Sequence, residues 1–279
     1  MMYDVRLNIL KDKVDKFIVT ESTYSHSGKK KKLNFDISNY PKFKDKIIHV
    51  VIDKEPDGIV PENNDPSLQR SNSLKRIALS YDESLKALKE SSDEDLIMLS
   101  DNDEIPNLSS KDFTTNKKDI FLFKQLFFYF RFNLLYDRMY WFGTKGCKKK
   151  KLKSLSWLRN IKLKKYPFWR LDTLFSETKQ INLQIIQDGG WHFTNLKTPE
   201  EMYEKFMNFG HHDEFRLSGL TIEKIREKIK NKEMFYDHFA DQSSTNKWKS
   251  DYKLKKYDSS LLPKYLSDNQ NKYKEWFDD

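Results

Sequence analysis

Three carboxylates in one short run are the residues of this chain best suited to chemistry. Asp101, Asp103 and Glu104 follow an apolar segment, and the run stops at Pro106, which cannot continue a strand. Side chains alternate along an extended backbone, so we expect Asp101 and Asp103 to point the same way. Two converging carboxylates repel each other unless a cation lies between them, and hard oxygen ligands suit Mg²⁺ or Mn²⁺. The pattern predicts a divalent metal site; the alternative is a solvated acidic turn that caps the next element.

A second set of candidates follows residues 181–187, which we expect to form a strand. Gly189 and Gly190 would let a ligand approach the backbone beside Trp191 and His192. The alternative is a core histidine beside a tight bend. A further cluster, residues 210–215, carries two adjacent histidines whose side chains point in different directions, so at most one is expected to face a shared site.

The elements that must position these residues alternate between helices and strands over the first 112 residues. We expect helices at 3–14 and 67–89, and strands at 16–20, 46–52 and 95–100. This order predicts an α/β layer structure in which ligands bind beyond the carboxyl ends of the strands. Both Glu21 and Asp101 sit at such ends.

After Asp112 the pattern changes to aromatic strands followed by helices. We expect antiparallel strands at 120–133 and 140–143 around a turn at 136–138, and helices at 152–161, 199–209 and 222–230. The polar tail from Gln242 ends in apolar residues at 261–266, which we expect to dock on the domain. The sequence has no internal repeat and no linker, so we expect one domain, 1–279, with halves of about 1–112 and 113–279.

Composition favours a folded protein without a membrane span. The chain has 279 residues, 37% of them hydrophobic, and the longest apolar stretch falls short of the ~20 residues of a membrane helix. Cys147 is the only cysteine, and residues 1–6 lack the apolar core of a signal peptide, so we expect a cytoplasmic protein. The net charge of +9 is densest at lysines 29–32 and 148–151, which we interpret as solvated loops because no aromatic residues are interleaved with them.

Several motifs, read in order, carry a resemblance to a known family. They are residues 3–10, 14–23, 28, 32–35, 69–70, 101–106, 141–144, 189–193, 212–215 and 263–266. As a set they resemble the glycosyltransferases of family seventeen, the bisecting β-1,4-N-acetylglucosaminyltransferase type, over nearly the whole chain.

The resemblance implies a GT-A-like nucleotide-sugar-binding fold, with a central mixed sheet flanked by helices, and transfer of a sugar with inversion. The first half would bind the UDP-sugar and the second the glycan or glycoprotein acceptor. N-acetylglucosamine is the sugar that the family suggests, although glucose and galactose remain open. The implied partners are therefore a nucleotide-sugar donor and an acceptor, and no nucleic acid.

The resemblance also assigns roles to residues. A Mn²⁺ or Mg²⁺ ion on Asp103, supported by Asp101, would neutralise the leaving diphosphate, and His192 and His212 compete for the third protein ligand. Donor contacts fall to Glu21 and Ser22 at the end of the first strand, to Arg70, to Asp101 and to Trp191. Inversion needs one general base, and Glu214, Asp188 and Glu104 are the available carboxylates, with Glu214 favoured.

Three functions of other classes compete with this interpretation. They are a nucleic-acid-binding basic protein, a metal-dependent phosphohydrolase or nucleotidyltransferase that uses the same aspartates, and a non-catalytic relative. The carboxylate run argues against the first because it would repel phosphates, and the retention of Asp101, Asp103, His192 and Glu214 argues against the last.

Overall fold

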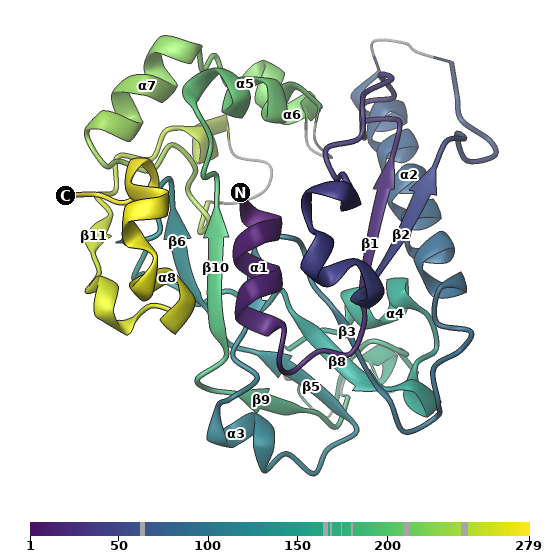
Figure 1. Ribbon diagram of the computed structural model, residues 1–279. Coiled ribbons are helices and arrows are strands. Elements are labelled where there is room, and N and C mark those ends of the chain that lie inside the picture. Colours follow the sequence, from purple (N-terminus) through teal and green to yellow (C-terminus); the bar gives the residue numbers. More distant parts are fainter. Residues whose placement is uncertain are drawn as a thin grey trace.

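A computed structural model gives the structure of the chain except for residues 62–64, 164–166, 168, 174, 180, 209–211 and 241–244. The described residues form an α/β protein with three mixed or parallel sheets and helices around them (Figure 1). We expected one central sheet, and that part of the prediction is wrong. The α/β class and the flanking helices are confirmed.

The N-terminal part carries a small parallel sheet. Helix α1 (Met2–Leu10) leads into β1 (Phe17–Ser22), which pairs in parallel with β2 (Ile47–Ile52), and α2 (Pro66–Lys86) packs against both strands. Two short 3-10 helices, η1 (Ile37–Asn39) and η2 (Pro41–Lys46), connect the strands. Figure 1 shows β1, β2 and α2 together on the right. The predicted helices and strands of this region are confirmed, with ends shifted by a few residues.

The second sheet has the order β3-β8-β5-β9. Its strands are β3 (Leu96–Leu99), β8 (Lys145–Lys148), β5 (Ile120–Phe123) and β9 (Gln184–Ile186). The short helices α3 (Lys111–Thr114) and α4 (Leu155–Asn160) flank this sheet, and α4 packs on β3 and β8. The lysine run 148–151 starts at the end of β8 and continues in the 3-10 helix η3 (Lys149–Lys151), so the prediction of a loop there is wrong for Lys148.

The third sheet has the order β11-β7-β6-β10-β4. Its strands are β4 (Glu104–Pro106), β6 (Leu126–Tyr129), β7 (Leu134–Leu135), β10 (Gly190–Thr194) and β11 (Lys255–Lys256). β10 runs parallel to β6 and antiparallel to β4, with His192 opposite Glu104. Because β10 lies between β6 and β4, it brings residues about 90 positions apart in the sequence into register.

The aromatic run at 120–133 is two strands in different sheets, and not the single strand that we predicted. The parallel pair β5/β9 ends where the chain bends, and the pair β6/β10 begins beyond the bend. At the bend the Gly189 N–H donates to the Lys124 carbonyl and the Lys124 N–H donates to the Ile186 carbonyl, each at 3.0 Å, and a Cβ on Gly189 would lie 2.4 Å from the Lys124 nitrogen. Of the predicted strand 140–143, only Trp141 pairs, in an isolated antiparallel bridge to Gln125.

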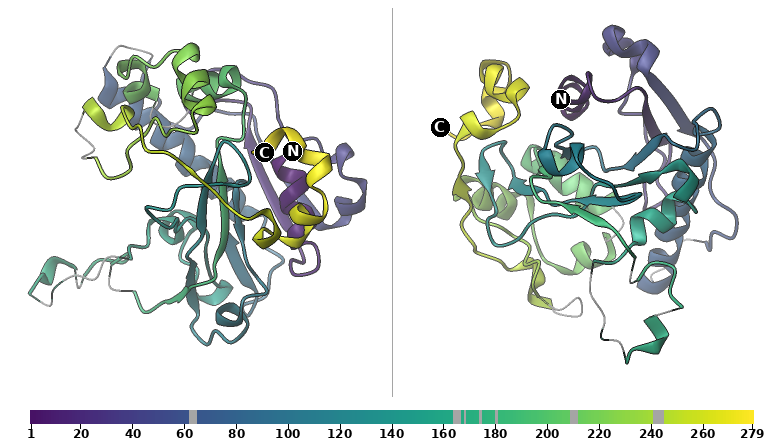
Figure 2. Two further views of the ribbon diagram at one scale, coloured as in Figure 1. Left: turned by 90° about the vertical axis from the view of Figure 1, so that its left-hand side faces the viewer. Right: turned by 90° about the horizontal axis from the view of Figure 1, so that it is seen from below.

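The C-terminal part is mostly helical. Helices α5 (Pro199–Asn208), α6 (His212–Leu217) and α7 (Ile222–Lys230) share a core with β6, and 3-10 helices lie at Leu171–Thr173, Thr245–Trp248 and Ser259–Leu261. The last helices, α8 (Lys264–Asp268) and η7 (Gln270–Trp276), lie beside α1 (Figure 2). Leu262 and Leu266 are buried there, which confirms that the tail docks on the domain. In the part of the chain with coordinates, no helix has both the length and the apolar character needed to cross a membrane.

Candidate functional site

The carboxylate run is a turn. The Glu104 N–H donates to the Asp101 carbonyl at 3.1 Å, so residues 101–104 reverse direction and do not continue β3. The expectation of an extended backbone with Asp101 and Asp103 side by side is therefore wrong. Asp101 pairs with an arginine and Asp103 with a histidine. We call residues Asp101–Glu104 the carboxylate turn.

Glu104 is the buried centre of this turn. Its Oε2 accepts the Asp101 N–H at 3.0 Å, and its Oε1 accepts the Trp141 indole N–H at 2.7 Å. Burial raises the pKa of Glu104, and the charge of Asp101 raises it further, while Arg159 acts in the opposite direction. Gly143 makes room for this carboxylate, since a Cβ there would lie 1.7 Å from Oε1.

Two arginines hold the turn from separate helices. Arg159 of α4 pairs with Asp101, with 2.8 Å between Nη2 and Oδ2, and its Nη1 lies 3.6 Å from Glu104 Oε1. Arg6 of α1 donates to the main-chain carbonyls of Glu104 and, at 3.4 Å, of Asp101. Sequence reasoning missed both arginines as site residues. Arg6 lies inside one of the family motifs, whereas nothing in the sequence around Arg159 pointed to it.

Asp103 and His192 form the second half of the site. His192 Nε2 lies 3.5 Å from Asp103 Oδ1, and the His192 ring stacks on Phe127 with 4.7 Å between ring centroids. The His192 side chain is buried, and its Nδ1 has no hydrogen-bond partner among the described residues. Burial alone would raise the pKa of Asp103, but the charge and hydrogen bond of His192 lower that pKa to about 2.

The strand register explains why these residues meet. The Phe193 N–H donates to the Asp103 carbonyl at 2.8 Å, which fixes the carboxylate turn against β10 near its carboxyl end. Next to it, the Tyr129 hydroxyl lies 2.6 Å from His238 Nε2. Burial lowers the pKa of His238 to about 4, and the charge of His192 adds to this, so His238 is neutral at pH 7. His238 is a further residue that sequence reasoning missed.

Of the predicted donor contacts, Asp101 is part of the carboxylate turn and Trp191 lies next to it in the third sheet, whereas Glu21, Ser22 and Arg70 belong to β1 and α2. Glu21, in β1, accepts hydrogen bonds from Lys31 Nζ, from the main chain and side chain of Asn34 and from the main chain of Phe35, at 2.6–2.9 Å. This carboxylate therefore holds the loop that follows β1. Ser22 Oγ accepts the Tyr24 N–H, and Arg70 lies on α2. Trp191 pairs with Ile105 and Leu126 in the third sheet, with its side chain partly buried.

The three candidate bases are also separated. Glu104 is inside the turn, whereas Asp188 is exposed and accepts a hydrogen bond from Asn107 Nδ2 at 2.8 Å, beyond the other end of β4. Glu214 lies on α6 and pairs with Lys247 at 2.5 Å. His212 opens the same helix, but its side chain lies outside the described residues, as does His211 entirely. The structure thus brings together Asp101, Asp103, Glu104 and His192 of the predicted site.

The side-chain ligands of this site fit a divalent metal ion only if a substrate completes its coordination shell. Within the part of the chain that is described, no three His, Cys, Asp or Glu side chains are grouped as a metal site. Asp103 and His192 are adjacent, but Asp101 is engaged by Arg159. Mg²⁺ typically takes only one or two carboxylates from a protein and the remaining oxygens from water and substrate phosphates. The residues present therefore fit an ion that arrives with a diphosphate.

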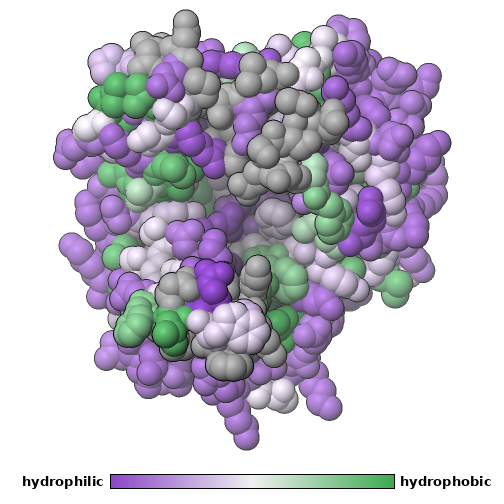
Figure 3. Space-filling model, turned by 180° about the vertical axis from the view of Figure 1, so that it is seen from behind, coloured by the Kyte–Doolittle hydropathy of each residue, from purple (hydrophilic) through white to green (hydrophobic). Residues whose placement is uncertain are grey.

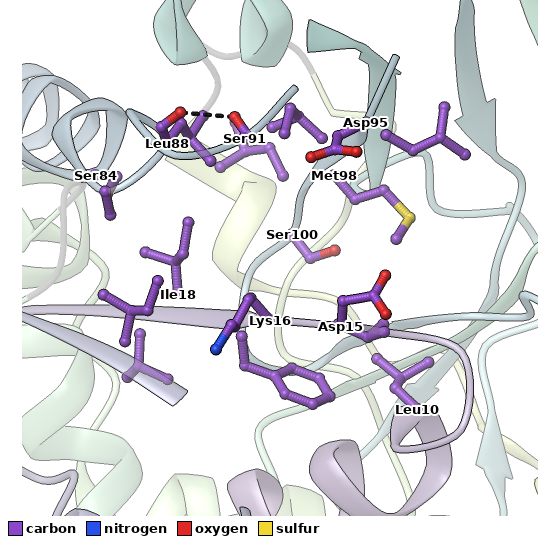
Figure 4. A pocket seen from close by; sticks show the side chains of 18 of the residues that line it. Leu10, Asp15, Lys16, Ile18, Ser84, Leu88, Ser91, Asp95, Met98 and Ser100 are labelled. Atoms are coloured by element: carbon purple, nitrogen blue, oxygen red, sulfur yellow. Dashed lines mark hydrogen bonds between the residues drawn. The ribbon is translucent and has the colours of Figure 1, made fainter. Parts of the chain in front are cut away.

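A cleft of about 790 Å³ leads to the turn between α1, β1 and β3. Figure 4 shows Met98 and Ser100 across this cleft from Lys16 and Leu10. β1 belongs to the first sheet and β3 to the second, so residues of two sheets line this cleft. Asn102 lines the cleft, and its buried Oδ1 finds no donor within the described structure. Seen from the opposite side to Figure 1, the surface is mostly hydrophilic and hollowed near its middle (Figure 3).

Comparison with known proteins gave one match. A protein-family model described as Glycosyltransferase family 17 matches residues 1–277. No curated protein and no solved structure matches the chain. The matched range includes α1 with Arg6, the carboxylate turn and the C-terminal helices.

Proposed function

The chain belongs to glycosyltransferase family 17 and is a glycosyltransferase; on that premise we propose that it is a metal-dependent, inverting enzyme on a GT-A-like fold. Its donor is a UDP-sugar, with N-acetylglucosamine as the sugar, and its acceptor is a hydroxyl of a glycan or glycoprotein. A cytoplasmic location belongs to the same proposal. The observation that carries it is the Asp103–His192 pair at the carboxyl end of β10.

The chemistry of the pair suits metal binding. Asp103 is ionised at neutral pH, and a metal ion would replace the proton through which His192 lowers the pKa of this carboxyl group, because an imidazole binds a metal in its neutral form. His192 presents Nε2 to the same carboxylate at 3.5 Å, so the two side chains could share one ion. A Mn²⁺ or Mg²⁺ ion there would neutralise the diphosphate that leaves when the glycosidic bond breaks.

The other carboxylates of the turn have supporting roles in this proposal. Arg159 holds Asp101, and Trp141 with the Asp101 N–H holds Glu104, so neither oxygen pair is free to reorient. Such fixed groups would preserve the geometry around the leaving diphosphate without reorganising during the reaction. The cleft that Asn102 lines is a second place for parts of the donor.

The general base is proposed to be Glu214. Glu104 is fully buried and bonded within the turn, and Asp188 lies at the far end of β4, so neither is placed to meet an acceptor hydroxyl. Glu214 is partly exposed on the helical half, with 29% of its side chain accessible. A base there would take the proton of the acceptor hydroxyl as that oxygen attacks the anomeric carbon.

The test is a thermal-shift titration of UDP with Mn²⁺ and with EDTA. A ligand that binds the native state raises the melting temperature, so UDP should stabilise the protein only when Mn²⁺ is present. Asp103→Asn should lose this shift, and Asp251→Asn, a change at an exposed site, should keep it. Equal stabilisation in EDTA would contradict the metal dependence. Release of inorganic phosphate from the nucleotide sugar, in place of UDP, would contradict glycosyl transfer.

A further inference from the structure

A partly buried lysine of α5 interacts electrostatically with Asp103 of the carboxylate turn. Lys205, on α5, donates from Nζ to the side-chain oxygen Oδ1 of Asn195 at 3.0 Å. That acceptor is neutral, and Lys205 forms no ion pair with any residue that the structure describes. Burial lowers the pKa of Lys205, and the nearby charge of Asp103 partly offsets this. A partly buried ammonium without a counter-ion is costly unless a ligand supplies the anion.

The turn that holds Lys205 is itself unusual. Asn195 directly follows β10 and adopts a left-handed backbone with φ of 57°, although it is not glycine. It is also buried, with 8% of its surface accessible. Residues kept in this region at a buried strand end cluster at ligand sites, because the surrounding structure must enforce them. This left-handed turn, which asparagine adopts more readily than most residues, places the side chain that accepts from the Lys205 ammonium.

The register places this arrangement at the metal end of the site. Phe193, two residues before Asn195, donates its N–H to the Asp103 carbonyl at 2.8 Å. Lys205 is therefore anchored just past the point where β10 meets the carboxylate turn. The two other cations of the site are engaged, since Arg159 pairs with Asp101 and Arg6 donates to main-chain carbonyls.

We propose that Lys205 is a phosphate-binding residue of the donor site, whose ammonium meets an oxygen of the nucleoside diphosphate. This rests on the proposed function, because it takes the donor to be a nucleoside diphosphate sugar. Asn195 holds the ammonium in the empty site and gives way to the phosphate when the donor binds. No covalent step is involved.

The position of Lys205 predicts opposite effects on the binding of the metal and of the nucleotide. Without a donor, the ammonium and a metal ion on Asp103 are like charges near one carboxylate, so Lys205 opposes binding of the metal alone. With a donor, the diphosphate lies between both cations, so Lys205 favours binding of the nucleotide. Loss of the Lys205 charge should therefore strengthen binding of the metal alone and weaken binding of the nucleotide.

The experiment is isothermal titration of the full chain with Mn²⁺ alone, and with UDP in saturating Mn²⁺. We expect Lys205→Met to bind UDP about tenfold more weakly, as for a lost charge-assisted hydrogen bond. The same variant should bind Mn²⁺ alone about twofold more tightly or better. Lys205→Arg should keep UDP affinity near that of the unchanged protein. Lys224→Met, which removes an exposed lysine of α7, should change neither affinity.

Each other outcome decides the question. Unchanged UDP affinity in Lys205→Met overturns only the phosphate-binding role of Lys205. The proposed function would still hold. Equal weakening of UDP and Mn²⁺ binding means that Lys205 is structural, which also overturns it. If the unchanged protein binds no UDP with Mn²⁺, both proposals fail together. Should Lys205→Met not fold, Lys205→Gln replaces it, with the same expected changes.

Discussion

Trp141 joins the two halves of the site, because it donates its indole N–H to Glu104 at 2.7 Å while its ring packs on His192 at 4.7 Å between centroids. One side chain thus fixes the buried carboxylate of the turn and the ring that faces Asp103. Position 141 belongs to no regular strand, and only its bridge to Gln125 ties its backbone to the sheet. These side-chain contacts add to the main-chain bond between Phe193 and Asp103 in fixing the turn relative to β10.

Trp141→Phe should destabilise the protein while keeping the aromatic packing. The substitution removes the donor to a fully buried carboxylate, and an unsatisfied buried partner costs about 1–3 kcal/mol. Urea unfolding would measure the loss. Trp169→Phe is the matched control, because Trp169 is 68% exposed. An equal loss in both variants would mean that the Glu104 hydrogen bond contributes nothing.

Asp103 should make the protein more stable as the pH rises from about 2 to 4. Its pKa is about 2 in the folded chain and 3.8 ordinarily, so the unfolded chain binds the proton first and the stabilisation is lost as the pH falls through this window. The shift corresponds to about 2 kcal/mol. Asp103→Asn should flatten the acid limb of a plot of unfolding free energy against pH, recorded in EDTA. A variant whose acid limb matches that of the unchanged protein would refute the ion pair with His192.

Asp4 should stabilise the attachment of the C-terminal segment to α1. Its Oδ2 accepts hydrogen bonds from Lys272 Nζ and the Tyr273 hydroxyl, each at 2.5 Å, and so ties the C-terminal segment to the helix that carries Arg6. Asp4→Asn should lower the free energy of unfolding by about 1–3 kcal/mol, the usual worth of a charged hydrogen-bond partner.

Limited proteolysis is the second measurement for Asp4. Faster cleavage within residues 264–277 is expected in Asp4→Asn, because the segment loses its attachment to α1. Asp12→Asn, an exposed change just beyond the helix, is the control and should leave the cleavage rate as it is. Unchanged cleavage in Asp4→Asn would show that apolar packing alone holds the segment.

Glu214→Gln should slow sugar transfer by roughly 10²–10⁴-fold, the usual worth of a general base, and leave UDP binding with Mn²⁺ intact. The measurement is single-turnover transfer beside a UDP titration. Lys247 pairs with Glu214, so Lys247→Met serves to separate the loss of the ion pair from the loss of the base. Near-normal transfer by Glu214→Gln would eliminate it, and Asp188→Asn would be measured next.

The sequence predicts the local elements well and the site only in part. The helix at 222–230 has the bounds expected from its periodicity, and β1, β2 and β3 lie where apolar runs end at polar or turn residues. These signals are local, so one sequence suffices. The bend at Lys124 could not be predicted, since it depends on a main-chain contact with Gly189, 65 residues away.

The carboxylate turn shows the same limit at the site. Alternation along a strand is a local rule, and it fails here because a buried Glu104 accepts the Asp101 N–H and draws the chain into a turn. The partners that stabilise this come from Trp141, Arg159 and Arg6, on three separate segments. Glu21 illustrates the converse, because a carboxylate at a strand end proved to hold its own loop.

Substitutions of Gly143 should abolish the activity of this enzyme even though Gly143 takes no part in the chemistry. The residue has no side chain to bind or react, yet Glu104 occupies the space where one would go, and both Glu104 and Trp141 are tied by the hydrogen bond between them. Even a methyl group at position 143 would force Glu104 and Trp141 apart. A substitution of an exposed aspartate, in contrast, would leave the fold unchanged. In a random mutational screen for inactive clones, position 143 should therefore tolerate substitution as poorly as Asp103. Its variants would keep every residue of the site, but those residues would be displaced.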